Sequence, residues 1–336
     1  MGRIGIGLIG LASRSQYEYA DWFSENPYSK VVAVSDENKQ TGMEAAQRYS
    51  AEWHSDFNTL LSREDVDAVC ICSENVYHAK QVLTSIRAKK HVLCDNPLAL
   101  TLKDCDKIIG ETKNNGVKLF VPFRPRLNAA LSQLKSLVED DTIGDLRAVY
   151  FLALFPRSTQ GSESWLFDHS KSGGGCILNV GSHAIDYALW LTKKKPERIY
   201  AVAKGKTNEK TENGSVITIR FEKGPIVTIV ASWLGGRTKG SVDATAIGEM
   251  VVDLIGYKRI ITMDAYHQKL DVYGVDQDKE EQIYWGMPDS TLAVTTFLNS
   301  IVRDEEIHPD GQDAKVSLEL VLAAYKSVEV GSPVKM

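Results

Sequence analysis

The fold is decided near the N-terminus by the stretch Arg3-Ile4-Gly5-Ile6-Gly7-Leu8-Ile9-Gly10-Leu11-Ala12-Ser13-Arg14-Ser15. An apolar strand, a turn of small residues and a helix, here from Gln16 to about Ser24, are how a dinucleotide-binding fold begins. The literal G-x-G-x-x-G of Gly5, Gly7 and Gly10 is misleading, because the apolar residues around the first two glycines indicate a buried strand. The turn therefore begins at Gly10.

Counted from Gly10, the turn has the pattern Gly10-x-Ala12-x-x-Ser15, which is the dinucleotide fingerprint with small residues in place of two glycines. Ala12 stands where the backbone must approach a diphosphate closely, and a methyl group is small enough for that. Free N–H groups at the start of the helix would face the phosphates. The motif alone does not exclude an ordinary strand, turn and helix. On this basis we predict a cofactor site that includes Gly10, Leu11, Ala12, Ser13 and Arg14.

A second apolar strand, residues 30–35, ends in Asp36, 26 residues after Gly10. At this distance an acidic residue accepts hydrogen bonds from an adenosine ribose, although Asp36 could also be a simple turn or helix-cap residue. A carboxylate there repels a 2′-phosphate by about 3 kcal/mol at roughly 5 Å and an effective dielectric constant near 20. We therefore predict NAD as the cofactor, while Arg14 and Lys39 leave NADP open.

Size and composition describe an ordinary globular protein with room for two domains, because the chain has 336 residues, 43% of them hydrophobic and 25% charged. A net charge of -5, with no basic run longer than Lys193-Lys194-Lys195, argues against a nucleic-acid surface. No apolar window is long enough to span a membrane. Five cysteines without paired spacing suggest reduced thiols in a cytoplasmic protein. The histidines show no metal-ligand spacing, so we predict no catalytic metal.

Strands and helices alternate through the first third of the chain, which predicts an α/β fold with a doubly wound parallel sheet of the Rossmann type over residues 1–122. The further strands are expected at 66–72, 91–94 and 117–121, and the helices between them at 75–88 and 102–114. Ligands of such sheets lie beyond the carboxyl ends of the strands. This rule adds Ser73, Glu74, Asn75, Asp95 and Asn96 to the candidate cofactor site.

From residue 123 to 336 the pattern changes to that of an α+β domain with a large, mostly antiparallel open sheet. Expected helices are 125–139, 291–303 and 312–330, and expected strands are 146–155, 215–221, 225–232, 243–247, 250–255, 260–263 and 270–273. A long polar loop, residues 157–172, precedes Gly173-Gly174-Gly175. Loops of this length are often functional, and the glycines would let the backbone approach the nicotinamide or substrate, unless they form a flexible linker.

The order of these motifs resembles the glucose-fructose oxidoreductase and inositol dehydrogenase (Gfo/Idh/MocA) family over essentially the whole chain. The resemblance is carried by the Gly10 turn, Asp36, residues 73–78, residues 90–99, Trp165 and residues 173–186. It implies hydride transfer between NAD(P) and a sugar, polyol or similar substrate. It also implies that His78 joins the cofactor site and that the C-terminal sheet forms a homodimer or homotetramer.

The resemblance implies a catalytic lysine and aspartate at positions where this chain has Asn96 and Asn179, so that His183 alone remains of the usual catalytic set. We take His183, Asn179 and Asn96 as the catalytic candidates. The implied substrate site comprises Asn96, Arg126, Trp165, Lys171, Asn179, His183 and Asp186.

Oxidation of an alcohol needs a base for the hydroxyl proton, and an imidazole titrates in the right range. Asp186, three residues after His183, could serve as its acidic neighbour on a helix. Asn96 supplies no cation, so a developing alkoxide loses stabilisation of about 3 kcal/mol, which Lys171, Arg124 or Arg126 could replace. The asparagines can still hydrogen-bond sugar hydroxyls. His183 could instead be a structural histidine at the start of a helix.

The sequence thus predicts an NAD-preferring oxidoreductase that acts on sugars or polyols. A non-catalytic NAD(P)-binding sensor on the same fold is the alternative, because two ionisable residues are replaced by Asn96 and Asn179. A glycosidase that retains NAD is a third. The first should reduce free NAD+ with a polyol, whereas the other two should not.

Overall fold

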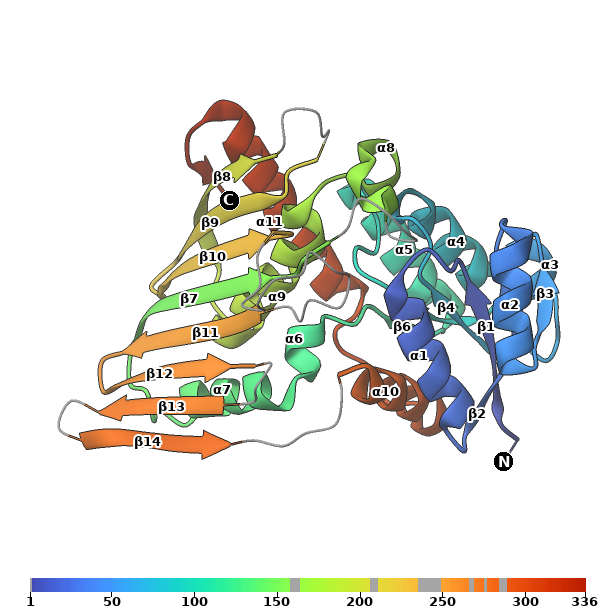
Figure 1. Ribbon diagram of the computed structural model, residues 1–336, viewed down its shortest axis with the longest axis horizontal. Coiled ribbons are helices and arrows are strands. Elements are labelled where there is room, and N and C mark those ends of the chain that lie inside the picture. The colour runs from blue at the N-terminus through green and yellow to red at the C-terminus, as the bar shows by residue number, and fades with distance from the viewer. Residues whose placement is uncertain are drawn as a thin grey trace.

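Two units stand side by side in the computed structural model of the protein, and the chain ends lie on opposite units (Figure 1). The structure describes residues 2–157, 164–205, 211–234, 249–265, 269–274, 277–283 and 289–336. Within these ranges, the backbone alone is described for Arg14 and for residues 269–270, 274 and 277–283. The strand expected at 243–247 lies outside the described residues.

The first unit contains a six-stranded parallel sheet with the order β3-β2-β1-β4-β5-β6. Its strands are β1 (Ile4–Ile9), β2 (Ser29–Ser35), β3 (Glu52–His54), β4 (Ala68–Ile71), β5 (His91–Cys94) and β6 (Leu119–Phe120), and its helices are α1 (Arg14–Glu25), α2 (Lys39–Tyr49), α3 (Phe57–Leu61), α4 (Asn75–Arg87) and α5 (Leu102–Asn115). Apolar side chains of α1 and α2 pack on one face, and those of α4 and α5 pack on the other. The predicted doubly wound sheet is confirmed.

Strand β1 explains why the first two glycines are not the turn. All six of its residues are buried. A Cβ atom on Gly5 would overlap the Asp65 carbonyl oxygen, and one on Gly7 would come within 2.6 Å of the Leu60 side chain. Both glycines therefore serve close packing of the strand.

The second unit contains a nine-stranded sheet with the order β14-β13-β12-β11-β7-β10-β9-β8-β15 among the described residues. Its strands are β7 (Leu146–Leu154), β8 (Pro196–Lys204), β9 (Gly214–Phe221), β10 (Ile226–Ser232), β11 (Glu249–Gly256), β12 (Arg259–Asp264), β13 (Lys269–Gly274), β14 (Gln277–Ile283) and β15 (Val334–Lys335). Every pair is antiparallel except β7 with β10, as expected for a mostly antiparallel sheet.

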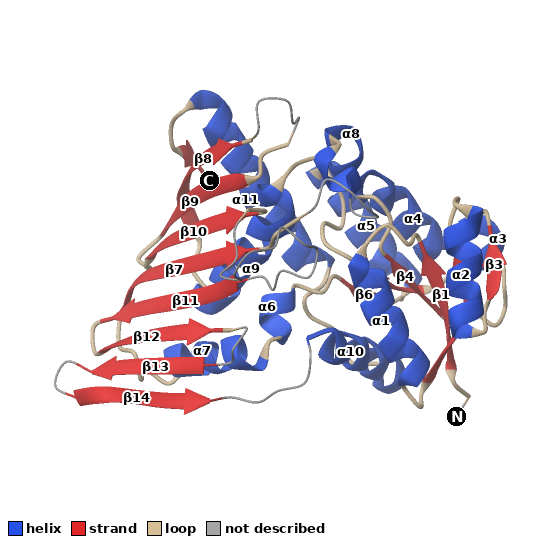
Figure 2. Cartoon of the chain, in the orientation of Figure 1, coloured by secondary structure: helices blue, strands red, loops and turns tan. Residues whose placement is uncertain are grey.

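Helices cover the face of this sheet that is turned toward the first unit, and the opposite face is open (Figure 2). They are α7 (Ala129–Glu139), α9 (Ser182–Thr192) and α11 (Gly311–Val330), with the short segments α6 (Arg124–Leu127), η1 (Ser164–Phe167), α8 (His169–Ser172) and η2 (Ile177–Gly181) near the junction. The helix expected at 125–139 is broken at Asn128. The backbone of Asn128 is extended, and its side-chain oxygen caps α7 by accepting from Leu131 N (3.1 Å).

Helix α10 (Asp289–Arg303) returns from the second half of the chain to pack on the first unit. Its Phe297 ring lies 6.3 Å from Phe23 of α1 and 6.4 Å from Phe120 of β6. Just after it, the Pro309 carbonyl accepts from Val121 N (3.0 Å). The chain thus crosses between the units more than once, at 122–124 and again near 289 and 309.

No helix in the described part of the chain has the length and apolar character to cross a bilayer. The five cysteines are buried and free, in line with the sequence prediction.

Candidate active site

The turn after β1 has the backbone that its sequence predicts. Gly10 has φ +76°, and a Cβ atom there would come within 2.5 Å of Ser73 Cβ at the end of β4. Only glycine fits such a position. The Ser13 hydroxyl caps α1 by accepting from Ser15 N (3.1 Å), and Leu11 N donates to Asp36 Oδ2 (2.8 Å). The turn and the carboxylate after β2 are therefore neighbours.

These residues fit a dinucleotide. The positive end of the α1 dipole suits a diphosphate, the small side chain of Ala12 leaves the backbone accessible, and Asp36 stands where a ribose hydroxyl would donate. The Ala12 carbonyl accepts from Trp165 Nε1 (2.8 Å), which joins the predicted loop of the second unit to the turn. The side chain of Arg14 lies outside the description.

A pocket of about 220 Å³ lies between the turn and the large sheet. Nine predicted site residues line it, namely Ser13, Ser73, Asn75, His78, Asp95, Asn96, Trp165, Asn179 and His183. Gly10, Leu11, Ala12, Asp36 and Glu74 lie outside this lining. So do Arg126, Lys171 and Asp186, which the structure does not bring to the pocket.

His183 enters the pocket from the first turn of α9. Its Nδ1 is buried and has no hydrogen-bond partner among the described residues, which leaves Nε2 as the ring nitrogen open to the pocket. The ring stands edge-on to Phe123 at 5.7 Å. Burial, together with the positive charges of Arg124 and Arg157, lowers the pKa of His183 to about 3. The free protein therefore holds a neutral imidazole at this site, and its pKa lies below the near-neutral range expected from the sequence because the ring is buried beside two arginines.

Asn179 and Asn96 both line the pocket. Asn179 lies in the π-helical segment η2, and π-helical turns are frequent at functional sites. Its Oδ1 accepts from Trp233 Nε1 (3.0 Å). Asn96, which follows β5, donates through Nδ2 to Ser182 Oγ (2.7 Å). Both amides are thus held by one contact each and also border the pocket.

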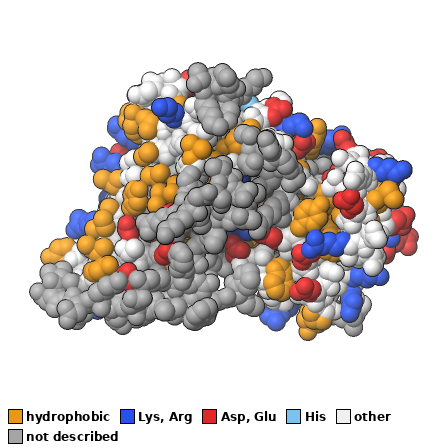
Figure 3. Space-filling model, in the orientation of Figure 1, with side chains coloured by type: hydrophobic (Ala, Val, Ile, Leu, Met, Phe, Trp, Pro, Cys, Tyr) orange, Lys and Arg blue, Asp and Glu red, His pale blue; other side chains and the backbone are white. Residues whose placement is uncertain are grey.

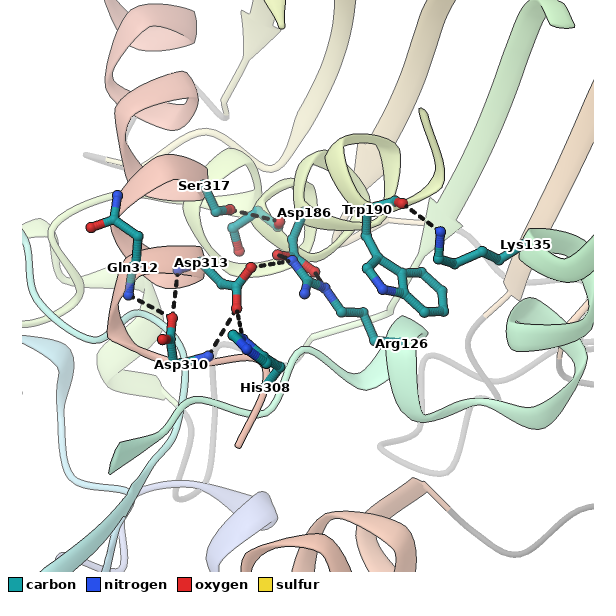
Figure 4. Close-up of polar contacts among 10 residues, drawn as sticks. Arg126, Lys135, Asp186, Trp190, His308, Asp310, Gln312, Asp313 and Ser317 are labelled. Atoms are coloured by element: carbon teal, nitrogen blue, oxygen red, sulfur yellow. Dashed lines mark hydrogen bonds and ion pairs between the residues drawn. The ribbon is translucent and has the colours of Figure 1, made fainter. Parts of the chain in front are cut away.

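Arg126 and Asp186 bind each other instead of facing the pocket. Figure 4 shows Arg126 between Asp186 and Asp313. Arg126 Nε and Nη2 donate to the two Asp186 oxygens (2.7 and 2.6 Å), and Nη2 also donates to Asp313 Oδ1 (3.0 Å). Burial raises the pKa of the fully buried Asp186 to about 7, although Arg126 opposes the shift. The expectation that Asp186 partners His183 is wrong, because its carboxylate binds Arg126 and no hydrogen bond joins it to His183 among the described residues.

Lys171 and Glu74 form an ion pair (2.7 Å) across the two units, in which the Lys171 side chain is 44% exposed. Next to it, Asn75 Nδ2 donates to the Ser172 carbonyl (2.8 Å). His78 borders the pocket, but its ring nitrogens lie 2.7 Å from Pro97 O and 3.0 Å from Ser73 O. A neutral imidazole can donate to only one of these carbonyl oxygens, but the ring lies between both and so links the residues that follow β4 and β5.

The glycine triplet makes a close approach, but to protein rather than to the pocket. A Cβ atom on Gly174 would overlap the Tyr325 hydroxyl, and one on Gly175 would overlap the Glu212 backbone. Gly175 N donates to the Glu212 carboxylate (3.1 Å) and to Tyr325 OH (3.1 Å). The triplet thus anchors the start of η2 to the sheet and to α11.

Several lining residues escaped sequence reasoning, among them Ser15, Glu18, Phe155, Arg157 and Met250. Phe155 and Arg157 follow β7, and Trp233 follows β10. Because these two strands are the parallel pair, their carboxyl ends meet at one edge of the sheet. Recognising a parallel pair within the antiparallel pattern would have found Phe155 and Arg157.

Arg124, a cation candidate from the sequence, does line the pocket. Its Nη2 donates to Ser15 Oγ (3.1 Å) and Glu18 Oε2 (2.6 Å) on α1. Of the three cations that the sequence offered, Lys171, Arg124 and Arg126, Arg124 is therefore the one that lines the pocket. It also binds α1, the helix that begins at the cofactor turn.

Comparison with known proteins agrees with this architecture. Residues 4–123 match a family described as "Oxidoreductase family, NAD-binding Rossmann fold", and residues 131–251 match the "GFO/IDH/MocA C-terminal domain". Myo-inositol 2-dehydrogenase of Thermotoga maritima is 27% identical over 348 residues, covering 100% of this chain and 98% of that protein. A solved structure of levoglucosan dehydrogenase in complex with NADH and levoglucosan has a TM-score of 0.86 at 18% identity, over 99% of both chains. A probable dehydrogenase from Thermotoga maritima has a TM-score of 0.80 at 26% identity, over 99% of this chain and 98% of its own. The chain belongs to the Gfo/Idh/MocA family of NAD-binding oxidoreductases.

Proposed function

We propose that the protein oxidises a secondary hydroxyl group of a sugar or polyol with NAD+, or reduces the matching ketone with NADH. The observation that carries the proposal is the neutral His183 imidazole, whose open Nε2 shares the pocket with two amide side chains. The pocket adjoins a turn and helix N-terminus that fit a dinucleotide. The name of the myo-inositol relative supports the polyol class.

His183 Nε2 would take the hydroxyl proton as the alcohol is oxidised. NAD+, when bound, supplies the acceptor for the hydride. Arg124 and Arg157 disfavour an imidazolium, and the same positive charges favour a deprotonated substrate oxygen. The two arginines thus offer part of the stabilisation that Asn96 does not provide.

NAD rather than NADP is the proposed physiological cofactor, because the Asp36 carboxylate beside Leu11 N would repel a 2′-phosphate. The same assay run with both cofactors, on the wild type and on Asp36→Ala, tests this point. A variant with unchanged preference would remove the argument.

The decisive test is NADH formation from NAD+ across inositols, aldoses, anhydrosugars and polyols, and NADH consumption with their keto forms. We expect turnover by the wild type, a loss of 10²–10⁴-fold in kcat for His183→Ala, and an unchanged Kd for NADH measured by fluorescence, because the substitution removes an acid/base group only. NADH binding without turnover on any compound would favour the sensor and contradict the enzyme.

The open face of the large sheet is the proposed contact between subunits of a homodimer or homotetramer. Exposed apolar side chains line it, namely Tyr150, Tyr200, Val202, Val216, Ile226, Ile255 and Ile260. Figure 3 shows hydrophobic side chains gathered over the side of the molecule that this sheet forms. Exposed apolar side chains gathered on one face of a protein often mark an interface. Light scattering should give a mass of at least two chains, and Val216→Lys with Ile226→Lys should give a monomer.

A further inference from the structure

Asn179 and His183 stand on one continuous helix, residues 176–192, which we call the catalytic helix. Its backbone is helical at Cys176 (φ -65°, ψ -26°) and still helical at Ser182 (φ -59°, ψ -37°), so η2 runs into α9 without a break. The first N–H groups of a helix have no partner within it and need acceptors from elsewhere. The acceptors at this end therefore help to set where Asn179 and His183 lie.

A single residue between β8 and β9, Glu212, accepts from three consecutive N–H groups at this end. Gly175 N lies 3.1 Å from each carboxylate oxygen, and Ile177 N donates to Oε1 (2.9 Å). Between them, Cys176 N donates to the backbone carbonyl of Glu212 (2.9 Å). A negative charge at a helix N-terminus is also favoured by the helix dipole. Glu212 thus caps the catalytic helix with its side chain and its backbone.

Tyr325 of α11 completes this cap. Burial raises the pKa of Tyr325 well above its usual value, and the neighbouring Glu212 raises it further, so the hydroxyl keeps its proton. The hydroxyl donates to Glu212 Oε1 (2.8 Å) and accepts from Gly175 N (3.1 Å). A side chain at position 175 would overlap the Glu212 carbonyl oxygen, so glycine is needed for this close approach.

The capped residues connect directly to Asn179. Gly175, whose N–H binds Glu212, accepts through its carbonyl from Asn179 N (3.0 Å). The side-chain oxygen of Asn179 accepts from Trp233 Nε1 (3.0 Å). Trp233 N in turn donates to the carbonyl of Asn213 (2.8 Å), the residue after Glu212. Glu212 and Asn213 thus hold Asn179 from two sides, through the helix start and through the indole.

We propose that Glu212 is a positioning residue, whose carboxylate fixes the start of the catalytic helix and so places Asn179 and His183 in the pocket. Glu212 does not line the pocket itself, so it acts through the backbone of residues 175–177. A misplacement of reacting groups by about 1 Å can cost about 10²-fold in rate. The effect on rate rests on the proposed function, but the placement of Asn179 can be measured without turnover.

The Trp233 indole reports on Asn179 directly, because its N–H donates to the Asn179 side chain. The six tryptophans give indole N–H signals in a 1H–15N spectrum, and Trp233→Phe identifies the one to follow. Glu212→Leu removes the side-chain acceptors and leaves the backbone acceptor for Cys176 N. We expect the Trp233 signal to shift and its exchange with solvent to become about 10-fold faster, since the hydrogen bond to Asn179 is weakened. An unchanged Trp233 signal in a folded Glu212→Leu protein would overturn the inference, whatever the activity.

Turnover gives the second measurement. We expect kcat to fall by about 10²-fold for Glu212→Leu, with the Kd for NADH within about threefold of the wild type, because the reacting groups move and the cofactor turn does not. Glu212→Gln keeps one acceptor oxygen and should retain kcat within about 10-fold. A wild-type kcat in Glu212→Leu would overturn the inference. If the wild type turns over no compound, the proposed function fails and the Trp233 signal alone decides. If Glu212→Leu does not fold, a shifted Trp233 signal in Glu212→Gln upholds the inference and an unchanged one overturns it.

Asp56→Leu is the control that separates positioning from folding. Asp56 is an exposed carboxylate that caps α3 by accepting from Asn58 N (3.0 Å), and it lies outside the pocket lining. Both leucine variants remove a helix cap, so both should lower the melting temperature. Only Glu212→Leu should change the Trp233 signal and kcat. Equal changes in the two variants would reduce the effect to lost stability and contradict the positioning role.

Discussion

Two polar clusters lie near the junction of the two units and differ in how many of their atoms have partners. The pocket cluster, Asn96, Asn179 and His183, has one hydrogen bond per amide and none on the imidazole among the described residues. In the arginine cluster, Arg126 lies between Asp186 and Asp313, and both Asp186 oxygens accept hydrogen bonds from it.

The difference teaches which polar residues a ligand can use. Asp186 is only three residues from His183, and residue type alone assigns both to one site. Asp186 is nevertheless unavailable, because a buried carboxylate needs its partners to offset desolvation. Of these two clusters, only the pocket cluster has a buried polar atom without a hydrogen-bond partner among the described residues, and it is such groups that a substrate would satisfy. Unused hydrogen-bonding capacity therefore distinguishes site from scaffold better than charge does.

Replacing Arg126 should have the largest effect on stability and is the strongest test of the difference between the two clusters. Arg126→Met leaves the fully buried Asp186 without its partner, so we expect a loss of about 3–5 kcal/mol in the free energy of unfolding, measured with urea. Arg126→Met combined with Asp186→Leu should recover most of it, since both charges are then gone. Arg87→Met, at the exposed ion pair with Glu111 (2.7 Å), is the control and should cost less than about 1 kcal/mol. A small loss for Arg126→Met would show that the cluster is not scaffold.

The cofactor turn was predictable because its determinants are local. A positive φ at Gly10, small residues after it and a capped helix follow from residues adjacent in sequence. Asp36 was found from its spacing to that turn, and the Leu11 contact bears out the position. Strand periodicity likewise located the sheet of the second unit.

The partners of the pocket side chains were not predictable, because they come from distant parts of the chain. Arg126 and Asp313 are 187 residues apart, and Trp233 lies 54 residues from Asn179. Neither pairing leaves a periodic signal in the sequence. The glycine triplet shows the same limit. The sequence predicted a close approach to the nicotinamide or substrate, whereas the backbone of Gly175 closely approaches Glu212.

Lowering the pH should reduce the stability of the folded protein through the buried imidazole of His183. Burial and two arginines lower the pKa of His183 from 6.5 to about 3. Between these values the unfolded chain binds a proton that the folded protein does not, so stability falls as pH falls. From pH 7 to pH 5 the wild type should lose about 2 kcal/mol more than His183→Gln in urea unfolding. Parallel stability curves for the two proteins would contradict a buried neutral imidazole in the pocket cluster.

The smallest effect on stability and activity is expected from replacing Lys171, which tests whether this residue lies outside the pocket cluster. Its ion pair with Glu74 joins the two units but is 44% exposed on the lysine side, and exposed pairs contribute at most about 1 kcal/mol. Lys171→Met should therefore lower the free energy of unfolding by less than about 1 kcal/mol, and less still at high salt because ions screen the pair. Since Lys171 does not line the pocket, kcat/KM for the best polyol should change by less than about threefold. A fall of 10-fold or more, with unchanged stability, would move Lys171 into the substrate site and weaken the rule that polar atoms without partners mark it.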